Sequence, residues 1–137
     1  MNRLYDKTID GLSRSLDLRL ARHGVTTSNI ANAETPGYKA KKVDFEAELK
    51  QALDLDGLGP NRITDAGPMR DHQTELLSVK PDVYDNPDAE VSPDGNSVNL
   101  EREMVELAEN NLLYQTSVEL MRKKLGQLKY AISEGGR

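Results

Sequence analysis

Apolar residues recur at alternating spacings of four and three along the carboxy-terminal part of the chain. The positions are Leu100, Met104, Leu107, Asn111, Tyr114, Val118, Met121, Leu125, Leu128 and Ile132. This heptad pattern is typical of a helix that packs lengthwise along a partner helix. A helix over residues 99–132 would be roughly 50 Å long, which is too long to wrap within a small globule. We therefore predict that it lies against another helix.

The ends of this segment carry the residues expected at helix termini. Asn99 or Ser97 can cap the first free backbone amides, and Gly135 follows the last apolar position. Asn111 is the one polar residue of the apolar seam. It either fixes the register of the helix pair, at some cost in stability, or lies at the edge of the seam.

A second, less regular helical pattern covers the first 34 residues. Its apolar stripe contains Ile9, Leu12, Leu16, Leu20 and Ile30. Leu18 and Val25 stand off this stripe and widen it, so we expect the helix to touch more than one neighbour. The two terminal helices are the natural partners in an antiparallel, coiled-coil-like pair.

Between the helices the sequence predicts little regular structure. A short helix over residues 44–53, capped by Asp44, places Phe45, Leu49 and Leu53 on one face. Residues 54–96 hold five of the six prolines, and a short strand is predicted at 75–80. The predicted fold is mainly α, one structural unit in three segments: 1–34, 35–98 and 99–137.

Composition limits the core and the classes of partner. Only 36% of the 137 residues are hydrophobic and 4% are aromatic, so we expect oligomerisation to bury much of the apolar surface. The net charge of −5 is concentrated in residues 43–99, which hold thirteen acidic and four basic residues. Because the chain has no basic stripe interleaved with aromatic residues, nucleic-acid binding is disfavoured.

The segment from residue 28 to residue 38 predicts a helix end followed by a tight turn. Pro36 pushes Thr35 toward an extended conformation, and Gly37 can take a positive φ at the second corner of a type II turn. An ordinary helix stop explains the Pro-Gly pair alone, but it does not explain the whole run.

The sequence predicts no catalytic, cofactor or metal site, and hence no enzyme. The chain has no cysteine, so its two histidines, His23 and His72, form no recognisable metal-ligand spacing. His23 is interpreted as a packing residue. The acidic tract over residues 82–94 lacks the spacing of a calcium loop and is interpreted as a solvated loop. No window reaches the length of a membrane span, and the first residues lack the apolar core of a secretory signal.

Two runs of residues resemble one known family. The run Ser-Asn-Ile-Ala-Asn-Ala-Glu-Thr-Pro-Gly-Tyr-Lys, residues 28–39, closely resembles the motif near the amino terminus of bacterial flagellar rod and hook proteins. Residues 98–115, which end in Tyr114-Gln115, are similar to the carboxy-terminal pattern of the same axial family. Short length and the continuation over residues 38–45 most resemble the family's proximal-rod members.

The resemblance implies a structural subunit that polymerises through its terminal helices into the hollow proximal rod. Such a rod transmits torque and passes exported subunits. The implied partners are other copies, other rod proteins, the adaptor between rod and motor ring, and the type III export gate. The implied location is the periplasmic rod of the basal body, reached without a cleaved signal peptide. A soluble coiled-coil adaptor or export chaperone for axial proteins is the alternative.

The residues that this hypothesis assigns fall into two groups. The turn of the family motif contains Ser28, Asn29, Asn32, Thr35, Pro36, Gly37 and Tyr38. The assembly interface contains the five stripe residues of the first helix and the heptad positions from Leu100 to Leu128.

Overall fold

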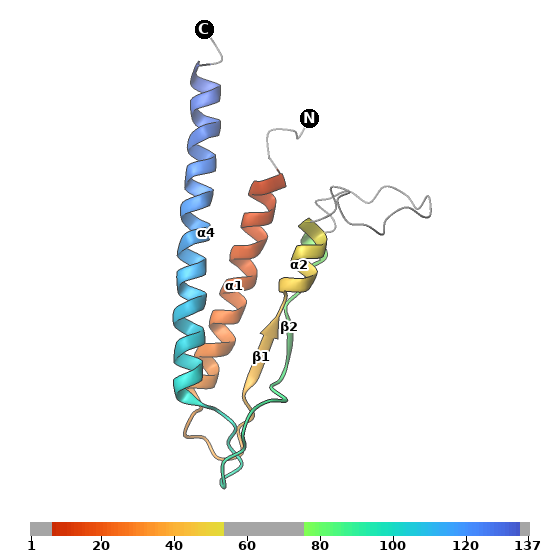
Figure 1. Ribbon diagram of the computed structural model, residues 1–137, viewed down its shortest axis with the longest axis vertical. Coiled ribbons are helices and arrows are strands. Elements are labelled where there is room, and N and C mark those ends of the chain that lie inside the picture. The colour runs from red at the N-terminus through yellow and green to blue at the C-terminus, as the bar shows by residue number, and fades with distance from the viewer. Residues whose placement is uncertain (1–6, 54–75, 135–137) are drawn as a thin grey trace, which may run out of the picture.

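The computed structural model describes residues 7–53 and 76–134 and is mainly helical (Figure 1). Two long helices run in opposite directions side by side, which confirms the predicted antiparallel pair. The elements, in chain order, are α1 (Lys7–Ala31), β1 (Lys41–Asp44), α2 (Glu46–Leu53), β2 (Asp82–Asp85) and α4 (Leu100–Glu134).

Helix α4 is the longest element, with 35 residues against 25 in α1. At 1.5 Å per residue these lengths correspond to about 52 Å and about 37 Å. Asn99 caps α4, because its side-chain Oδ1 accepts from the Arg102 backbone N–H at 3.0 Å, as one of the two predicted caps requires. The carboxy-terminal end of α4 extends beyond the start of α1 (Figure 1).

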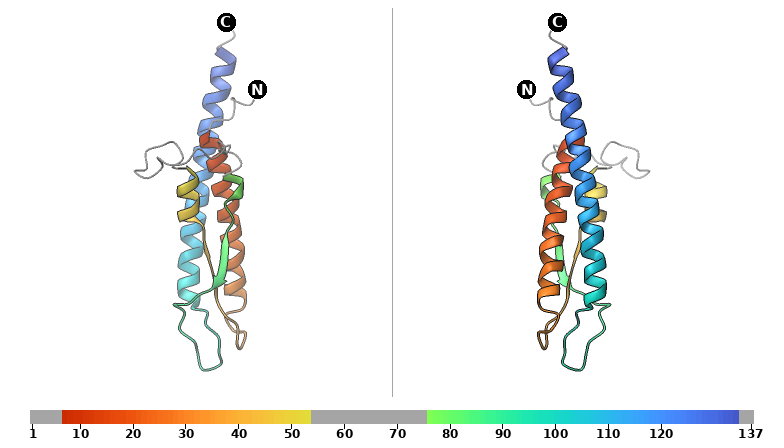
Figure 2. Two further views of the ribbon diagram at one scale, coloured as in Figure 1. Left: turned by 90° about the vertical axis from the view of Figure 1, so that its right-hand side faces the viewer. Right: turned by 90° about the vertical axis from the view of Figure 1, so that its left-hand side faces the viewer.

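The two strands and α2 form a second layer against α1. In Figure 1 this layer lies on the side of α1 away from α4, and Figure 2 shows that its strands run along the helix pair, not across it. Strands β1 and β2 are antiparallel, with Lys41 opposite Asp85 and Asp44 opposite Asp82. Helix α1 therefore contacts neighbours on two sides, as its widened apolar stripe predicts.

The hydrophobic core lies between α1 and this second layer. Leu18, Phe45 and Leu76 are its most buried side chains, at 1–2% exposure. Val25 packs against the cluster from α1. Leu18 and Val25, which stand off the predicted stripe, are thus the residues of α1 that face the strand layer. The remaining core residues are Val43, Leu49, Ala52 and Val79.

Two local predictions in the middle segment are wrong. The residues at 76–78 form a helical turn, not a strand, because Leu76 and Val79 are three positions apart and both are buried on one side. The strand lies further on, at β2. Asp44 is the last residue of β1 and does not cap α2, whose first hydrogen bond runs from the Leu49 N–H to the Phe45 carbonyl at 2.9 Å.

The core position of Leu18 gives a direct test of this packing. Leu18→Ala should lower the free energy of unfolding by about 2–5 kcal/mol, because it leaves a cavity in the core. Leu20→Ala is the matched control on the same helix; Leu20 is 62% exposed, so the change should stay within about 0.5 kcal/mol. Urea unfolding followed by circular dichroism measures both. Equal midpoints for the two variants would contradict the layer arrangement.

Candidate assembly interface

Asn96 caps the carboxy-terminal end of α1 from a distant part of the chain. Its Nδ2 donates to the carbonyls of Asn32, Ala33 and Thr35 at 3.0, 2.9 and 2.8 Å, across sequence separations of 61–64 residues. Its Oδ1 accepts from the Val98 N–H at 2.7 Å. These three carbonyls belong to the turn that directly follows Ala31, the last residue of α1, and the buried amide of Asn96 supplies a donor to each of them.

The turn after α1 adopts the predicted geometry. Gly37 has a φ of +73°, and the Tyr38 N–H donates to the Thr35 carbonyl at 3.2 Å across the turn. The turn is then joined to the segment before α4. The Gly37 N–H donates to the Asp94 carbonyl at 3.0 Å, and the Ser97 N–H donates to the Tyr38 carbonyl at 3.0 Å.

Two glycines allow these segments to meet backbone to backbone. Gly95 has a φ of +82°, a conformation that side chains disfavour. A Cβ on Gly95 would lie 3.3 Å from the Gly37 Cα, which is a close contact with rigid backbone. We call residues 29–41 and 94–97, taken together, the clasp. It joins the end of α1 to the start of α4.

The Asn29 side chain fixes β1 on α1. It is fully buried, at 0% exposure. Its Nδ2 donates to the Lys41 carbonyl at 2.7 Å, its Oδ1 accepts from the Lys41 N–H at 3.0 Å, and the Tyr38 hydroxyl donates to the same Oδ1 at 3.3 Å. The amide thus satisfies the free edge of β1 as a neighbouring strand would.

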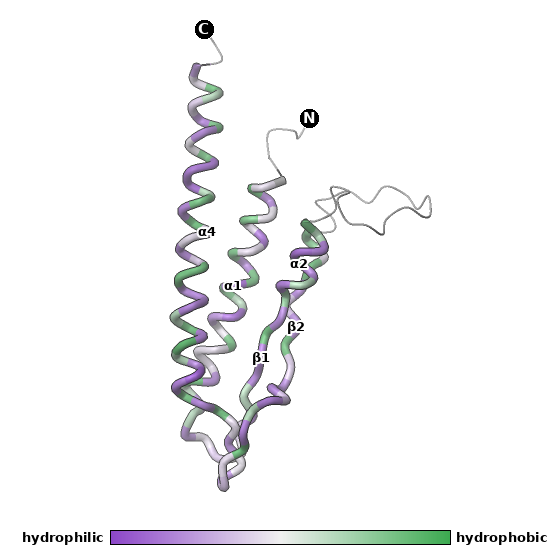
Figure 3. Tube along the Cα trace, in the orientation of Figure 1, coloured by the Kyte–Doolittle hydropathy of each residue, from purple (hydrophilic) through white to green (hydrophobic). Residues whose placement is uncertain are grey.

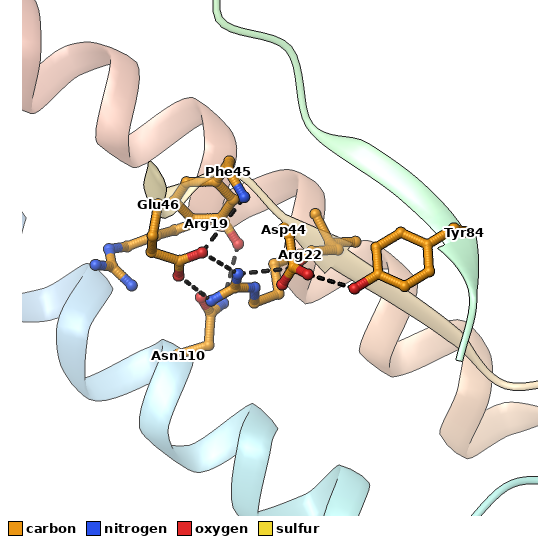
Figure 4. Close-up of polar contacts among 8 residues, drawn as sticks. Arg19, Arg22, Asp44, Phe45, Glu46, Tyr84 and Asn110 are labelled. Atoms are coloured by element: carbon orange, nitrogen blue, oxygen red, sulfur yellow. Dashed lines mark hydrogen bonds and ion pairs between the residues drawn. The ribbon is translucent and has the colours of Figure 1, made fainter. Parts of the chain in front are cut away.

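Arg22 holds the same edge of β1 two helical turns earlier (Figure 4). Its Nη2 donates to the Val43 carbonyl at 2.7 Å, its guanidinium lies 4.4 Å from the centroid of the Phe45 ring, and its Nη1 pairs with Glu46 at 2.5 Å. Burial alone would raise the pKa of Glu46, but the hydrogen bond and charge of Arg22 lower it below its ordinary value. Arg22 and Asn29 are seven positions apart and therefore share a face of α1.

The seam between α1 and α4 is polar at its centre. The buried residues of α4 are Glu103, Asn110 and Ser117, one per heptad. The Asn110 Nδ2 donates to the Arg19 carbonyl at 2.9 Å, and Ser117 donates to the carbonyl of Leu113 within its own helix. The buried positions of α4 therefore do repeat every seven residues, but polar side chains occupy the positions closest to α1.

Several polar atoms of this seam have no hydrogen-bond partner within residues 7–53 and 76–134. They are the Nε and Nη1 of Arg19, the Oε2 of Glu103 and the Oδ1 of Asn110. Burial raises the pKa of Glu103 above its ordinary value, against a hydrogen bond from Asn29, and burial lowers the pKa of Arg19. Unpaired buried polar groups are costly, so the seam limits the stability of the helix pair.

Many apolar side chains of α4 are exposed in the single chain, and the others are half-buried. No apolar residue of α4 is buried in the described part of that helix, and Figure 3 shows apolar positions along its whole length. Exposed apolar surface of this extent marks a site of association with other proteins. The exposed large residues are Leu100, Met104, Val105, Leu112, Leu113, Leu120, Leu125, Tyr130 and Ile132.

Comparison with known proteins places the chain in a family. The family described as flagella basal body rod protein matches residues 16–39, which cover the second half of α1 and the turn. The flagellar basal body rod protein FlgB of Cereibacter sphaeroides (strain ATCC 17029 / ATH 2.4.9) is 42% identical, over 88% of this chain and 89% of the relative. The chain belongs to the FlgB family. The FlgB proteins of Bacillus subtilis (strain 168) and Escherichia coli (strain K12) are 34% and 35% identical, over 96% and 84% of this chain and 98% and 83% of their own lengths.

The turn residues of the family motif all lie at the end of α1 or in the clasp. The Asn32 Nδ2 donates to the Ser28 carbonyl at 2.8 Å, and the Thr35 hydroxyl donates to the Asn32 Oδ1 at 3.2 Å. Pro36 is exposed beside Gly37. The region that matches the FlgB family thus includes the first half of the clasp, and Asp94–Ser97 supply the second.

The predicted interface residues occupy mixed positions in a single chain of this FlgB-family protein. Asn111, the one polar residue of the predicted seam, is exposed in the single chain, as its alternative position at the edge of the seam requires, and the neighbouring Asn110 is buried. Ile9 is buried, and the half-buried residues are Leu12, Leu16, Ile30, Leu107, Tyr114, Val118, Met121 and Leu128. Leu20, Leu100, Met104 and Leu125 are 46–62% exposed. Their role in assembly stays a prediction.

Three functional residues escape the sequence analysis. Asn96 lies in the run Asp94-Gly95-Asn96-Ser97, directly before Ser97, one of the two predicted caps of the carboxy-terminal helix. Arg22 and Asn110 carried no signal of their own. For Asn96, the only sequence signal is the neighbouring Gly95, because glycine is favoured where two backbones approach closely.

Among the residues that the structure describes, neither His23 nor the acidic tract forms a metal-binding cluster. The His23 carbonyl accepts from the Thr27 hydroxyl at 2.7 Å within α1, and His72 lies outside the described residues. Asp82, Asp85, Asp88, Glu90 and Asp94 are exposed. Across the two described ranges, no group of three His, Cys, Asp or Glu residues is arranged to hold a metal ion, and no described helix is both long and apolar enough to cross a membrane.

Removing the cap on α1 tests the clasp. Asn96→Ala should lower the free energy of unfolding by about 1–3 kcal/mol, because it removes the hydrogen bonds of a buried amide to three carbonyls of the turn and to the Val98 N–H. Asn111→Ala is the control, since Asn111 is exposed on α4 and its loss should change stability by at most about 0.5 kcal/mol. Chemical unfolding measures both. If Asn111→Ala proves the more damaging change, the assignment of the two asparagines is wrong.

The buried Glu103 predicts a pH-dependent stability. Its raised pKa means that the folded chain favours the protonated carboxyl. The stabilisation of the folded state by this protonated carboxyl is therefore fully present below about pH 4.3, the unfolded-state pKa, and is lost as the pH rises through the folded-state pKa. Glu103→Gln should therefore raise the unfolding free energy by about 1 kcal/mol at pH 7 and leave it unchanged in acid. Thermal unfolding at the two pH values measures the difference. A gain of the same size from Glu101→Gln, an exposed position, would exclude burial as the cause.

Proposed function

We propose that this chain is a structural subunit of the flagellar basal-body rod that polymerises through its terminal helices. The observation that carries the proposal is the distribution of polar and apolar residues on α4. The helix buries the polar residues Glu103, Asn110 and Ser117 and leaves nine large apolar residues exposed. A helix of this kind is not complete within one chain. Its exposed apolar residues become buried when copies or related subunits pack around it.

The arrangement of the subunit suits an open, repeating assembly. An interface between two different surfaces of one subunit generates a helical filament when its rotation does not close into a ring. A long helix pair with exposed sides offers such surfaces along its length, and the clasp at one end turns the chain so that β1 and β2 run back along α1 (Figure 1). The names of the relatives, which place them in the basal-body rod, support this reading.

The finer parts of the proposal follow from the same role. The assembled rod is hollow and proximal, transmits torque and passes exported subunits through its channel. The subunit leaves the cell by type III export without a cleaved signal and resides in the periplasmic rod. Its partners are itself, other rod proteins, the adaptor to the motor ring and the export gate.

Incorporation into basal bodies tests the proposal. The unchanged chain should co-purify with basal bodies at a fixed stoichiometry. Leu112→Asp should remove it from them and abolish motility, because a charge replaces an apolar side chain that is 63% exposed in the single chain and buried in the assembly. The readouts are immunoblots of purified basal bodies and swimming assays.

A control on the same helix separates assembly from folding. Gln115→Asp introduces the same charge at an exposed polar position and should leave incorporation and motility intact. Both purified variants should retain the helical circular dichroism of the unchanged chain. If the unchanged chain stays in the cytoplasm and is absent from basal bodies, the soluble adaptor or chaperone hypothesis replaces this one.

A further inference from the structure

A groove of about 350 Å³ lies between α4 and β1, above α1. Its α4 wall contains Glu106, Glu109, Asn110 and Leu113, and its opposite wall contains residues 41–44. Arg22, Val25, Thr26 and Glu46 complete the lining. The groove has room for a row of side chains and not for a whole helix, so its occupant is a helix that lies against it and inserts side chains.

The α4 wall of the groove calls for a positively charged hydrogen-bond donor. Asn110 is 97% buried, lines the groove, and its Oδ1 has no partner in the described residues. Glu109, one residue away, adds a carboxylate on the α4 wall and interacts with the Arg19 guanidinium of the same chain. The charges of Arg22 and Glu46 neutralise each other, and Lys41 and Lys42 lie on the opposite wall. Leu113, 38% exposed, adds an apolar surface beside them. A lysine flanked by apolar side chains complements this wall.

The carboxy-terminal half of α4 carries lysines flanked by apolar side chains. Residues 100–118 hold four acidic residues and one basic residue, whereas residues 119–134 hold two acidic and four basic residues. The helix dipole favours this order of charges only within the first and last turns, so it does not account for Glu109 or Lys123. Leu120, Lys123 and Tyr130 share one face of the helix, and Leu120 and Tyr130 are 51% and 63% exposed.

We propose that the groove of one copy receives the basic half of α4 from a second copy, with Lys123 between Glu109 and Asn110. The ammonium group of Lys123 supplies three donors, enough for the carboxylate and the unpaired Oδ1 together. Leu120 and Tyr130 cover Leu113, the apolar residue of the α4 wall. This inference rests on the proposed function and names the two surfaces through which the subunits join.

The contact is head-to-tail because its two sides are different surfaces of one chain. Positions 109 and 123 are fourteen residues apart, about 21 Å along the helix. A copy that gives its basic half to one neighbour still has its own groove free for another. The contact therefore propagates and does not end at a dimer.

Engineered cysteines test the contact in assembled rods. The chain has no cysteine of its own. A chain with both Glu109→Cys and Lys123→Cys, incorporated into basal bodies and oxidised, should give a ladder of disulfide-linked multimers on a non-reducing gel. The two cysteines of one chain are about 21 Å apart, beyond the roughly 7 Å limit between Cα atoms, so every link joins two chains. Either single-cysteine chain should give no ladder and no dimer.

Charge exchange tests the same contact without cross-linking. Glu109→Lys and Lys123→Glu should each reduce incorporation about tenfold or more, because each places like charges together. The double variant should restore it, since the exchanged charges again attract. Glu90→Lys, the same charge change in an exposed loop outside the groove, is the matched control and should incorporate normally.

Each outcome separates this inference from the proposed function. If the unchanged chain is absent from basal bodies, the proposed function fails. If the unchanged chain is present but the double-cysteine chain gives no ladder, or the double charge variant is no better than either single one, only the head-to-tail contact is overturned. Dimers from a single-cysteine chain would indicate a two-fold interface and would also overturn it.

Discussion

The buried amide of Asn29 joins three elements of the structure. It hydrogen-bonds to both backbone groups of Lys41 on β1, accepts from the Tyr38 hydroxyl, and interacts with Glu103 on α4, whose pKa it lowers against the effect of burial. Asn96 completes the junction from the other half of the chain by capping the end of α1. Because these amides have no access to water, each lost contact leaves a buried polar group unsatisfied. The two asparagines therefore fix how the terminal helices leave the clasp.

The helix pair that extends from the clasp is specified by polar contacts more than by apolar ones. Asn110 binds the Arg19 carbonyl and sets the register, while the unpaired atoms of Glu103 and Arg19 weaken the pair. Buried polar residues at heptad positions are known to select register at a cost in stability. The polar seam has a second consequence, because nine large apolar residues of α4 stay exposed, where another subunit can cover them.

Much of the fold follows from local pattern, and the rest depends on contacts between distant residues. The helix pair was predictable from apolar spacing, and the φ of Gly37 from the Pro-Gly turn. Strand β2 was not, because Asp82–Asp85 has no alternation of buried residues and pairs only because β1 offers an edge. The cap from Asn96 spans more than sixty residues. Asn110 and Asn111 are adjacent amides, and a seven-residue period cannot choose between them without the partner helix.

Native-state hydrogen exchange tests most directly whether the clasp holds the two ends of the chain together. The N–H groups of Gly37 and Ser97 each donate across the clasp. In the isolated chain they should exchange with the same free energy of opening, well above that of amides near Tyr130 at the far end of α4. The account is contradicted if Gly37 and Ser97 exchange as fast as an unstructured peptide while the amides of α1 and α4 stay protected.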